Sequence, residues 1–541
     1  MNAPPWPAPL NEEEAARRYV AAGYWTEELI GDVIARHARA RPEGQAVVDD
    51  RRRLSWSELH AQVGAAAAVF AEQGLGRGDH VVLQMPNRVE FVVAFLALAR
   101  LGVVPVMALP GHRRYDLEYF CRHTDAAAIV WSADGDVDGE VPADELVASI
   151  PGLRSVAMGV DAGPPHVAWH LQTDADPERA PTQASRGDAG DVALLQLSGG
   201  STGTPKLIPR THADYLYSVR ESADICGLTA DSVYLCALPA AHNFAMTSPG
   251  ILGALHAGAA TVLCPDPSAT TAFALIEREG VTITGVVPPI AFMWLAQVGR
   301  TDRDLSSLEV LQIGGAPLAP DVAARIEPEF GCRLQQVFGM AEGLVNYTRL
   351  DDDTHRVLGT QGRPISPDDE VLIVDDHDVP VPAGQPGHLL TRGPYTIRRY
   401  FRAERHNEVA FTPDGFYRTG DLVREGPDGY LTVVGRAKEQ INRGGEKIAP
   451  VEIEGHLLTH DGVLEASVVG VDDRILGQRI VAHIVAADET QLDTETLLAH
   501  LDERGVARFK RPDRFVFADE LPRTAVGKTR TTALSTEASG G

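Results

Sequence analysis

The sequence predicts an α/β protein: a large N-terminal domain of layered α/β subdomains, followed by a small α+β C-terminal domain. Predicted strands and helices alternate along most of the chain, as they do in parallel α/β layers. A chain of 541 residues is also too long for one hydrophobic core. After Arg436 the pattern changes to a smaller unit of its own. We therefore expect domains at residues 1–436 and 437–541.

The elements can be placed in order from their apolar runs and turn residues. The N-terminal domain is expected to contain, among others, strands at Ala46–Asp50, Val81–Met85, Val192–Gln196, Val233–Leu238 and Val310–Ile313, and a helix that opens at Ser55. The C-terminal domain is expected to contain a helix opening near Ile448, strands at Leu464–Val471 and Arg479–Val485, and a helix at Leu492–Glu503.

Phe91–Pro110 is almost wholly apolar and must be tested as a membrane span. Arg100 lies inside it, and a charge at the centre of a membrane helix costs about 2.5–3.5 kcal/mol. A buried helix over about 88–101, started by a capping box at Asn87, and then a buried strand at Val103–Met107 fit better. We expect no membrane partner.

Charge and cysteine content exclude several classes of protein. The formal net charge of −26 argues against a nucleic-acid-binding surface, which needs clustered Lys and Arg. The five cysteines are odd in number and form no C-x-x-C pair, so neither a disulfide framework nor a zinc site is expected. The first residues lack the basic and apolar regions of a signal peptide. These features indicate a cytoplasmic protein.

A glycine- and hydroxyl-rich loop follows the strand Val192–Gln196. Its sequence from Leu197 to Lys206 is LSGGSTGTPK. Unhindered backbone N–H groups, short hydroxyls and one cation are suited to holding polyphosphate oxygens. Pro205 directly before Lys206 cannot donate a hydrogen bond and disfavours a helix there, so a Walker-type phosphate loop is excluded. The loop is expected to bind a nucleotide without γ-phosphoryl transfer.

The stretch from Leu195 to His212, LQLSGGSTGTPKLIPRTH, resembles the adenylate-forming superfamily of acyl-CoA synthetases, peptide synthetase adenylation domains and luciferases. Within it, the stretch is most similar to the stand-alone aryl acid adenylating enzymes of siderophore assembly. The resemblance extends over about residues 25–533. It implies that ATP and Mg²⁺ activate a carboxylate as an acyl-adenylate, and that the C-terminal domain is a mobile lid.

The resemblance implies a nucleotide site drawn from several loops. The phosphate loop would contribute Ser198, Gly199, Gly200, Ser201, Thr202, Gly203 and Lys206. The adenine would meet Gly314, Gly315, Ala316, Val337, Phe338, Gly339, Met340 and Ala341. Asp421 would chelate the ribose hydroxyls with Arg436 nearby, because one carboxylate can accept two O–H bonds from a cis-diol.

The resemblance also implies an aryl pocket, formed mainly after the strand Val233–Leu238. His242 would lie at the carboxylate end, Asn243 would bond a 2-hydroxyl, Phe244 would flank the ring, Ser248 would meet the 3-position, and Gly315 and Val345 would complete the pocket. Asparagine suits a phenol beside a carboxylate because it adds no charge. A serine at the 3-position favours 2,3-dihydroxybenzoate. Salicylate or a substituted salicylate stays open, since some relatives carry tyrosine in place of Phe244.

The same resemblance implies four catalytic residues: His242, at the carboxylate of the acid, and the charged residues Glu342, Lys438 and Lys528. Glu342 would hold Mg²⁺ together with the ATP phosphates. Lys528 would be the lid lysine that stabilises charge on the α-phosphate, and Lys438 would be the hinge about which the lid rotates.

The predicted function is aryl acid–AMP ligation, with transfer of the acyl group to the phosphopantetheine thiol of an aryl carrier protein in siderophore or nonribosomal peptide biosynthesis. The carrier is expected to be a separate protein, because these residues contain no carrier domain. Three alternatives share parts of the pattern: an aromatic acid–coenzyme A ligase, a luciferase-like oxygenase and a non-catalytic aryl-acid binding protein. The presence of Lys528 and Glu342 argues against the last.

Overall fold

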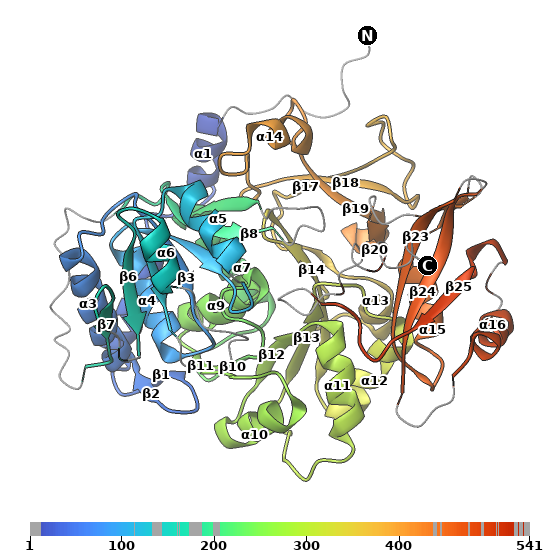
Figure 1. Cartoon of the computed structure of the whole chain (residues 1–541), viewed down its shortest axis with the longest axis horizontal. Coiled ribbons are helices and arrows are strands. Elements are labelled where there is room, and N and C mark those ends of the chain that lie inside the picture. The colour runs from blue at the N-terminus through green and yellow to red at the C-terminus, as the bar shows by residue number, and fades with distance from the viewer. Residues whose placement is uncertain are drawn as a thin grey trace.

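The computed structural model describes residues 12–112, 114–132, 143–159, 161, 163–172, 187–198, 206–436, 441–443, 446–448, 450–473, 476–487, 492–504, 506, 508–523, 529 and 534. Across these ranges the chain forms four β-sheets with helices packed around them (Figure 1). Helices α1 (Glu12–Ala21) and α2 (Ala35–Ala40) come before the first strand. None of the helices in these ranges combines the length and apolarity needed to cross a membrane.

The first large sheet has seven strands and holds the ends of the phosphate loop at one edge. Its order is β7 (Val167–Trp169), β6 (Arg154–Met158), β5 (Ala128–Trp131), β3 (His80–Gln84), β4 (Val104–Ala108), β8 (Val192–Leu197) and β9 (Leu207–Thr211). All neighbours are parallel except the antiparallel pair β8 and β9. The helices that follow β2 (Arg53–Ser55) and precede β6 along the chain are α3 (Trp56–Glu72), which contacts β2 and β1 (Gln45–Val48), α4 (Val89–Arg100), α5 (Arg114–Thr124) and α6 (Ala143–Ser149).

The second large sheet has nine strands and carries most of the predicted site. Its order is β16 (Arg363–Pro364), β15 (Gly343–Tyr347), β14 (Arg333–Met340), β13 (Val310–Gly314), β12 (Ile283–Val286), β10 (Val233–Cys236), β11 (Ala260–Leu263), β1 (Gln45–Val48) and β2 (Arg53–Ser55). The strands from β14 to β1 are parallel. Its helices are α7 (His212–Ile225), α8 (Asn243–Thr247), α9 (Gly250–Ala257), α10 (Ala269–Glu279), α11 (Pro288–Val298), α12 (Pro320–Phe330) and α13 (Thr354–Gly359).

Helix α4 packs inside the protein, as its apolar sequence predicts. All twelve of its residues are buried, and the ten apolar ones belong to a core that includes side chains from both large sheets. The predicted capping box is wrong. The Asn87 amide instead donates to the carbonyls of Leu238 (2.8 Å) and Cys264 (2.9 Å), which follow strands β10 and β11 of the second sheet. The Val89 N–H is capped by Asp49 Oδ2 at 3.0 Å. A side chain predicted to start a helix therefore joins two sheets.

Two smaller sheets complete the fold. The four-stranded antiparallel sheet consists of β17 (Glu370–Val374), β18 (Gly387–Arg392), β19 (Tyr417–Glu425) and β20 (Leu431–Arg436), with α14 (Glu404–Ala410) beside it. The C-terminal sheet has the order β22 (Glu446–Ile448), β21 (Ile441–Arg443), β24 (Gly477–Ala486) and β23 (Val463–Asp473), with β25 (Arg514–Phe517) parallel to β24. Helices α15 (Pro450–Leu457) and α16 (Thr494–Glu503) cover it.

The predicted fold class is confirmed: a large α/β domain precedes a smaller α+β domain with a hydrophobic core of its own. The last strand of the four-stranded sheet ends at Arg436, and the next described strand begins at Ile441. The predicted hinge, Lys438, lies outside the described residues, so its position as the domain boundary stays a prediction. All five cysteines are buried and free, as expected.

A buried carboxyl group connects the four-stranded sheet to the second large sheet. Tyr395 donates to Asp369 Oδ2 at 2.7 Å, and the Tyr395 hydroxyl accepts the backbone N–H of Val345 in β15 at 3.0 Å. The other oxygen of Asp369 is buried without a hydrogen-bond partner among the described residues, although the residue as a whole is half-buried. Burial raises the pKa of Asp369 to about 7.

This raised pKa predicts a stability that falls as pH rises. The folded pKa lies above the unfolded value near 3.8, so between these two pH values only the folded state holds the proton. We expect the melting temperature of the wild type to fall, relative to Asp369→Asn, by a few degrees between about pH 5 and about pH 8. Thermal unfolding at both pH values measures this difference. A difference that does not change with pH would contradict the prediction.

Candidate active site

The two ends of the predicted phosphate loop lie on the edge hairpin of the first sheet. Strands β8 and β9 pair antiparallel, with Leu197 opposite Leu207. Just beyond this pair, the Ser198 hydroxyl accepts the backbone N–H of Lys206 at 2.9 Å. Lys206 is followed by a strand and not by a helix, so the exclusion of a Walker-type loop is confirmed. The remaining predicted loop residues, Gly199, Gly200, Ser201, Thr202 and Gly203, lie outside the described residues.

A cleft of about 1330 Å³ separates the second large sheet from the C-terminal domain. Seven of the predicted nucleotide residues line it: Gly315, Ala316, Val337, Phe338, Gly339, Met340 and Asp421. The opposite wall comes from α15 and from β23, which Figure 1 shows in red beside the core domain. Loops at the carboxyl ends of β13 and β14 meet here because parallel strands end at the same edge of a sheet. The structure thus brings together residues that are up to 106 positions apart, from Gly315 to Asp421.

Other predicted site residues do not line this cleft. The residues outside the lining are Ser198, Lys206, Gly314, Ala341, Glu342 and the aryl residues His242, Asn243, Phe244, Ser248 and Val345. The cleft therefore gathers part of the predicted nucleotide site, and the five predicted aryl residues named here lie outside its lining.

The predicted ribose residues are paired on one hairpin. Asp421 in β19 is the ladder partner of Arg436 in β20. Asp421 is 5% exposed, and its backbone N–H donates to Thr419 Oγ1 at 3.0 Å. The hairpin anticipated from two short strands is therefore present, and Asp421 lines the same cleft as the adenine loop.

Phe244 of the aryl segment packs close to two glycines, Gly314 at the end of β13 and Gly285 in β12. A Cβ on Gly314 would lie 3.2 Å from Cε1 of Phe244 and 2.7 Å from the carbonyl oxygen of Val337. A Cβ on Gly285 would lie 3.3 Å from Cζ of Phe244. At Gly314, where the Cβ would also meet backbone, only glycine leaves room, whereas at Gly285 the ring would have to shift by a few tenths of an ångström. The predicted ring-flanking residue therefore packs directly against the predicted nucleotide loop.

Helix α8 presents the predicted aryl-binding side chains. His242 caps this helix, because its Nδ1 accepts the N–H of Phe244 at 3.3 Å. Asn243 follows in the first turn, and its Oδ1 accepts the hydroxyl of Tyr215 at 3.0 Å. Ser248 is 5% exposed just after the helix. Val345, opposite Gly339 in the β14–β15 ladder, is buried as well.

The side chain of Glu342 is held by Tyr400, whose hydroxyl also contacts that of Tyr417. Tyr400 donates its hydroxyl to Glu342 Oε1 at 2.8 Å, and the hydroxyls of Tyr400 and Tyr417 are 2.9 Å apart. Burial and the neighbouring Glu342 carboxylate raise the pKa of Tyr400, so it stays a donor. The Glu342 carboxylate is therefore already oriented by the protein.

The backbone around Glu342 is held too, by the segment that follows β18 and by β9. The Ile397 N–H donates to the Glu342 carbonyl at 2.7 Å. The Arg210 guanidinium donates to the Ala341 carbonyl at 2.8 Å. The Phe401 N–H donates to the Leu207 carbonyl at 2.9 Å, which ties the same segment to the strand after the phosphate loop.

The metal ligands that the protein offers suit a Mg²⁺ ion that is held mainly by the phosphates of ATP. Among the described residues no group of three or more His, Cys, Asp or Glu side chains could hold a metal ion by itself. Glu342 offers one carboxylate, on a residue that is 8% exposed and oriented by Tyr400. Mg²⁺ in nucleotide enzymes commonly takes one or two carboxylates and completes its shell with phosphate oxygens and water. The residues present therefore fit Mg²⁺ bound together with ATP.

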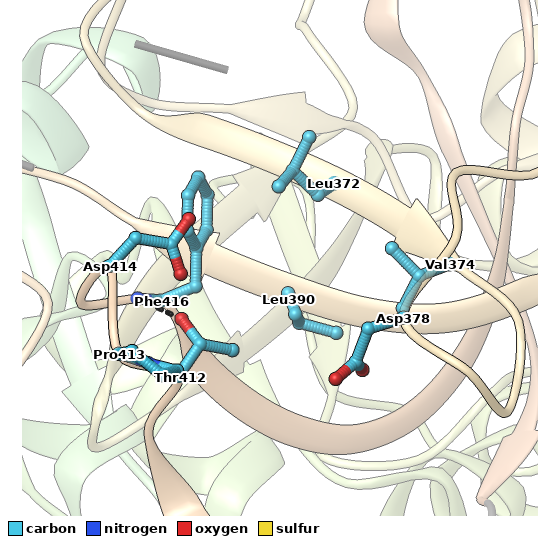
Figure 2. A pocket seen from close by; sticks show the side chains of 8 residues that line it. All are labelled: Leu372, Val374, Asp378, Leu390, Thr412, Pro413, Asp414 and Phe416. Atoms are coloured by element: carbon cyan, nitrogen blue, oxygen red, sulfur yellow. Dashed lines mark hydrogen bonds between the residues drawn. The ribbon is translucent and has the colours of Figure 1, made fainter. Parts of the chain in front are cut away.

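A second cavity, of about 140 Å³, lies on the four-stranded sheet and is separate from the predicted site. Figure 2 shows Leu372, Val374 and Leu390 along one side of it, and Asp414 beside Phe416 on the other. Its lining contains no residue that the sequence assigns to nucleotide or aryl acid. The large cleft is therefore the candidate active site.

Several supporting residues were not predicted. Tyr215 contacts Asn243, Tyr400 contacts Glu342, and Arg210 contacts the carbonyl before Glu342. The sequence contains only a weak signal for these three residues. Each is a polar side chain among apolar residues, which indicates that it is buried but does not indicate which residue it contacts. The predicted catalytic residues Lys528 and Lys438 lie outside the described residues.

Comparison with known proteins agrees with this geometry. Residues 34–401 match the AMP-binding enzyme family, and residues 452–528 match the AMP-binding enzyme C-terminal domain. The 2,3-dihydroxybenzoate-AMP ligase of Bacillus subtilis (strain 168) is 48% identical, with 98% of this chain and 96% of that protein covered. A salicylyl-CoA synthase / salicylate adenylyltransferase from Streptomyces is 46% identical, with 97% and 95% covered.

A solved structure supports the same assignment. The apo structure of Mycobacterium smegmatis MbtA has a TM-score of 0.73 and 45% sequence identity, with 98% of each chain covered. The resemblance inferred from the motifs is therefore confirmed, and the chain belongs to the AMP-binding enzyme family.

Proposed function

We propose that this enzyme activates a 2-hydroxylated aryl acid with ATP and passes the acyl group to the phosphopantetheine thiol of an aryl carrier protein in the cytoplasm. One contact carries the proposal: Phe244, in the aryl segment, packs against Gly314, in the adenine loop. A ring bound beside Phe244 and a nucleotide bound in the cleft would then be neighbours. The names of the relatives, a dihydroxybenzoate ligase and a salicylate adenylyltransferase, support an aryl acid.

The nucleotide would occupy the large cleft. Asp421 and Arg436 would meet the ribose, Gly315, Ala316 and the end of β14 would meet the adenine, and Ser198 and Lys206 would flank the phosphates. Glu342 would hold Mg²⁺, which when bound supplies positive charge to the phosphate oxygens. Lys528 would stabilise the charge that grows on the α-phosphate as the carboxylate attacks. Pyrophosphate would leave, and rotation about Lys438 would open access for the thiol.

The aryl pocket would select the acid by its hydroxyl groups. Asn243 would bond the 2-hydroxyl, and Ser248, which is buried, would favour a second hydroxyl at the 3-position. His242 would lie at the carboxylate, and Val345 beside the ring. An analogue without the hydroxyl would leave the polar side chain of the pocket without a hydrogen-bond partner. Such an unpaired group lowers kcat/KM for the analogue. Both 2,3-dihydroxybenzoate and salicylate are candidate substrates, because relatives of nearly equal identity are named for each.

An aromatic acid–coenzyme A ligase is the second candidate. One relative is named as a salicylyl-CoA synthase, and the adenylation half-reaction would be the same. Thioester formation with coenzyme A and with a phosphopantetheinylated carrier, assayed in parallel, separates the two by thiol preference.

The first test is ATP–pyrophosphate exchange with 2,3-dihydroxybenzoate, salicylate, benzoate and a fatty acid. We expect exchange with the two hydroxylated acids only, and a fall of about 10²-fold or more in Lys528→Ala, since a group that stabilises transition-state charge is removed. Lys510→Ala is the control, because the Lys510 ammonium group pairs with Glu452 at 2.5 Å. Exchange with none of the aryl acids, or full activity in Lys528→Ala, would sink the proposal.

A further inference from the structure

We infer that Tyr215 is a positioning residue: it orients the Asn243 amide so that the pocket accepts a 2-hydroxybenzoate and rejects a 2-aminobenzoate. This inference rests on the proposed function and deepens it. Tyr215 lies in α7 and is fully buried. Its hydroxyl is 3.0 Å from Asn243 Oδ1 and 3.2 Å from Gln196 Nε2.

The direction of these two hydrogen bonds follows from their atoms. The Gln196 amide nitrogen can only donate, so the Tyr215 oxygen accepts from it. The single Tyr215 proton goes to Asn243 Oδ1, while the Thr247 hydroxyl, a further neighbour of the Tyr215 oxygen, donates to the Asn243 carbonyl. Burial raises the pKa of Tyr215 to about 12, so this proton is retained at neutral pH. The Arg210 guanidinium lies 4.8 Å from the centre of the Tyr215 ring and holds the ring in place.

With Oδ1 accepting the Tyr215 hydroxyl, the oriented amide offers its N–H₂ group to a ligand. If the Asn243 amide turned over, its N–H₂ would face the Tyr215 O–H, and two donors would meet in a buried site. A buried donor without an acceptor is costly, so the turned amide is disfavoured. The Asn243 backbone is also held, because its carbonyl accepts the Thr247 hydroxyl at 3.2 Å. Asn243 therefore acts as a hydrogen-bond donor of fixed direction.

A fixed donor distinguishes two substituents of nearly equal size. In a 2-hydroxybenzoate the phenol proton bonds internally to the carboxylate, so the phenol oxygen faces outward as an acceptor. In 2-aminobenzoate one N–H bonds internally, and the second N–H faces outward as a donor. The Asn243 N–H₂ complements the first and opposes the second. Sites built around a specific hydrogen bond discriminate strongly against a ligand that leaves it unpaired.

The test compares Tyr215→Phe with the wild type. The substitution keeps the ring and its Arg210 contact but removes the proton that orients Asn243. We expect the ratio of kcat/KM for salicylate to that for 2-aminobenzoate, measured by ATP–pyrophosphate exchange, to fall at least about tenfold. The change is expected in KM for the acid, with KM for ATP retained. Gln196→Met, which removes only the bond into the Tyr215 oxygen, should shift the ratio in the same direction by less.

Tyr217→Phe is the matched control. Tyr217 lies two residues further along the same helix, is similarly buried, and donates to Ser366 Oγ at 2.7 Å, away from Asn243. It should leave the ratio unchanged. An unchanged ratio in a folded Tyr215→Phe, or an equal shift in Tyr217→Phe, overturns the inference alone. If Tyr215→Phe does not fold, an unchanged ratio in Gln196→Met overturns it. A wild type that exchanges with neither salicylate nor 2,3-dihydroxybenzoate overturns the proposed function and this inference together.

Discussion

Replacing Glu342 by glutamine is expected to lower kcat/KM for ATP by about 10²–10³-fold, as when other groups that stabilise transition-state charge are removed. Glutamine keeps an oxygen that can accept the Tyr400 hydroxyl, now at 2.8 Å from Glu342 Oε1, so the loop should stay in place. What is lost is the negative charge that would hold Mg²⁺. A lower kcat/KM in Glu342→Gln would therefore reflect loss of the metal site and not a change in the fold.

Binding of ATP, measured by calorimetry with and without Mg²⁺, provides a readout independent of turnover. Mg²⁺ should strengthen ATP binding to the wild type and much less to Glu342→Gln. Tyr400→Phe should raise the Mg²⁺ concentration needed for half-maximal exchange, because the carboxylate loses its orienting donor. Glu408→Ala, which removes an exposed carboxylate from nearby helix α14, is the control. An equal effect of Mg²⁺ on ATP binding to wild type and Glu342→Gln would refute this role.

Replacing Gly362 by alanine is expected to destabilise the protein by about 4 kcal/mol or more, at the upper end for single substitutions. Gly362 has φ +86°, and a Cβ there would lie 1.9 Å from the carbonyl carbon of Tyr347 in β15. Backbone cannot move aside as a flexible side chain can. The Gly362 carbonyl also accepts the N–H of Leu431 in β20 at 2.8 Å. The glycine thus lets the chain pass closely between two sheets.

Gly384→Ala separates the two causes of this destabilisation. Gly384 also has a positive φ, +79°, but nothing lies within 4 Å of the position its Cβ would take. It should cost only about 1 kcal/mol, which is the strain of left-handed backbone in alanine. Thermal unfolding and soluble yield of both variants measure the difference. Equal melting temperatures for the two variants would show that the contact with β15 does not matter.

The elements that sequence patterns predicted well are those with local signals. The apolar run at Val233–Leu238 contains strand β10, and the serine–glutamate pair at Ser55 forms a complete capping box for α3. Strand Glu370–Val374 was not among the predicted elements, although its apolar run from Val371 to Val374 is a local signal of the same kind.

The candidate site also contains some residues that local motifs predict and others that they do not. Motifs along the chain predicted which loops would meet, and seven of their residues do line one cleft. Motifs did not predict Tyr215, because nothing near it in sequence specifies a partner 28 residues away. Asn87 shows the reverse case, since a local capping signal was overridden by carbonyls about 150 residues further on.

The sequence by itself determined the α/β class, the strand ends that carry chemistry and the family to which the chain belongs. These follow from periodicity, glycine and proline chemistry, and short motifs, all of which act over a few neighbouring residues. Only the tertiary structure decided that Tyr400 orients Glu342 and that Tyr215 contacts Asn243. A hydrogen bond between distant elements depends on the register and packing of whole sheets and helices, which no local pattern contains.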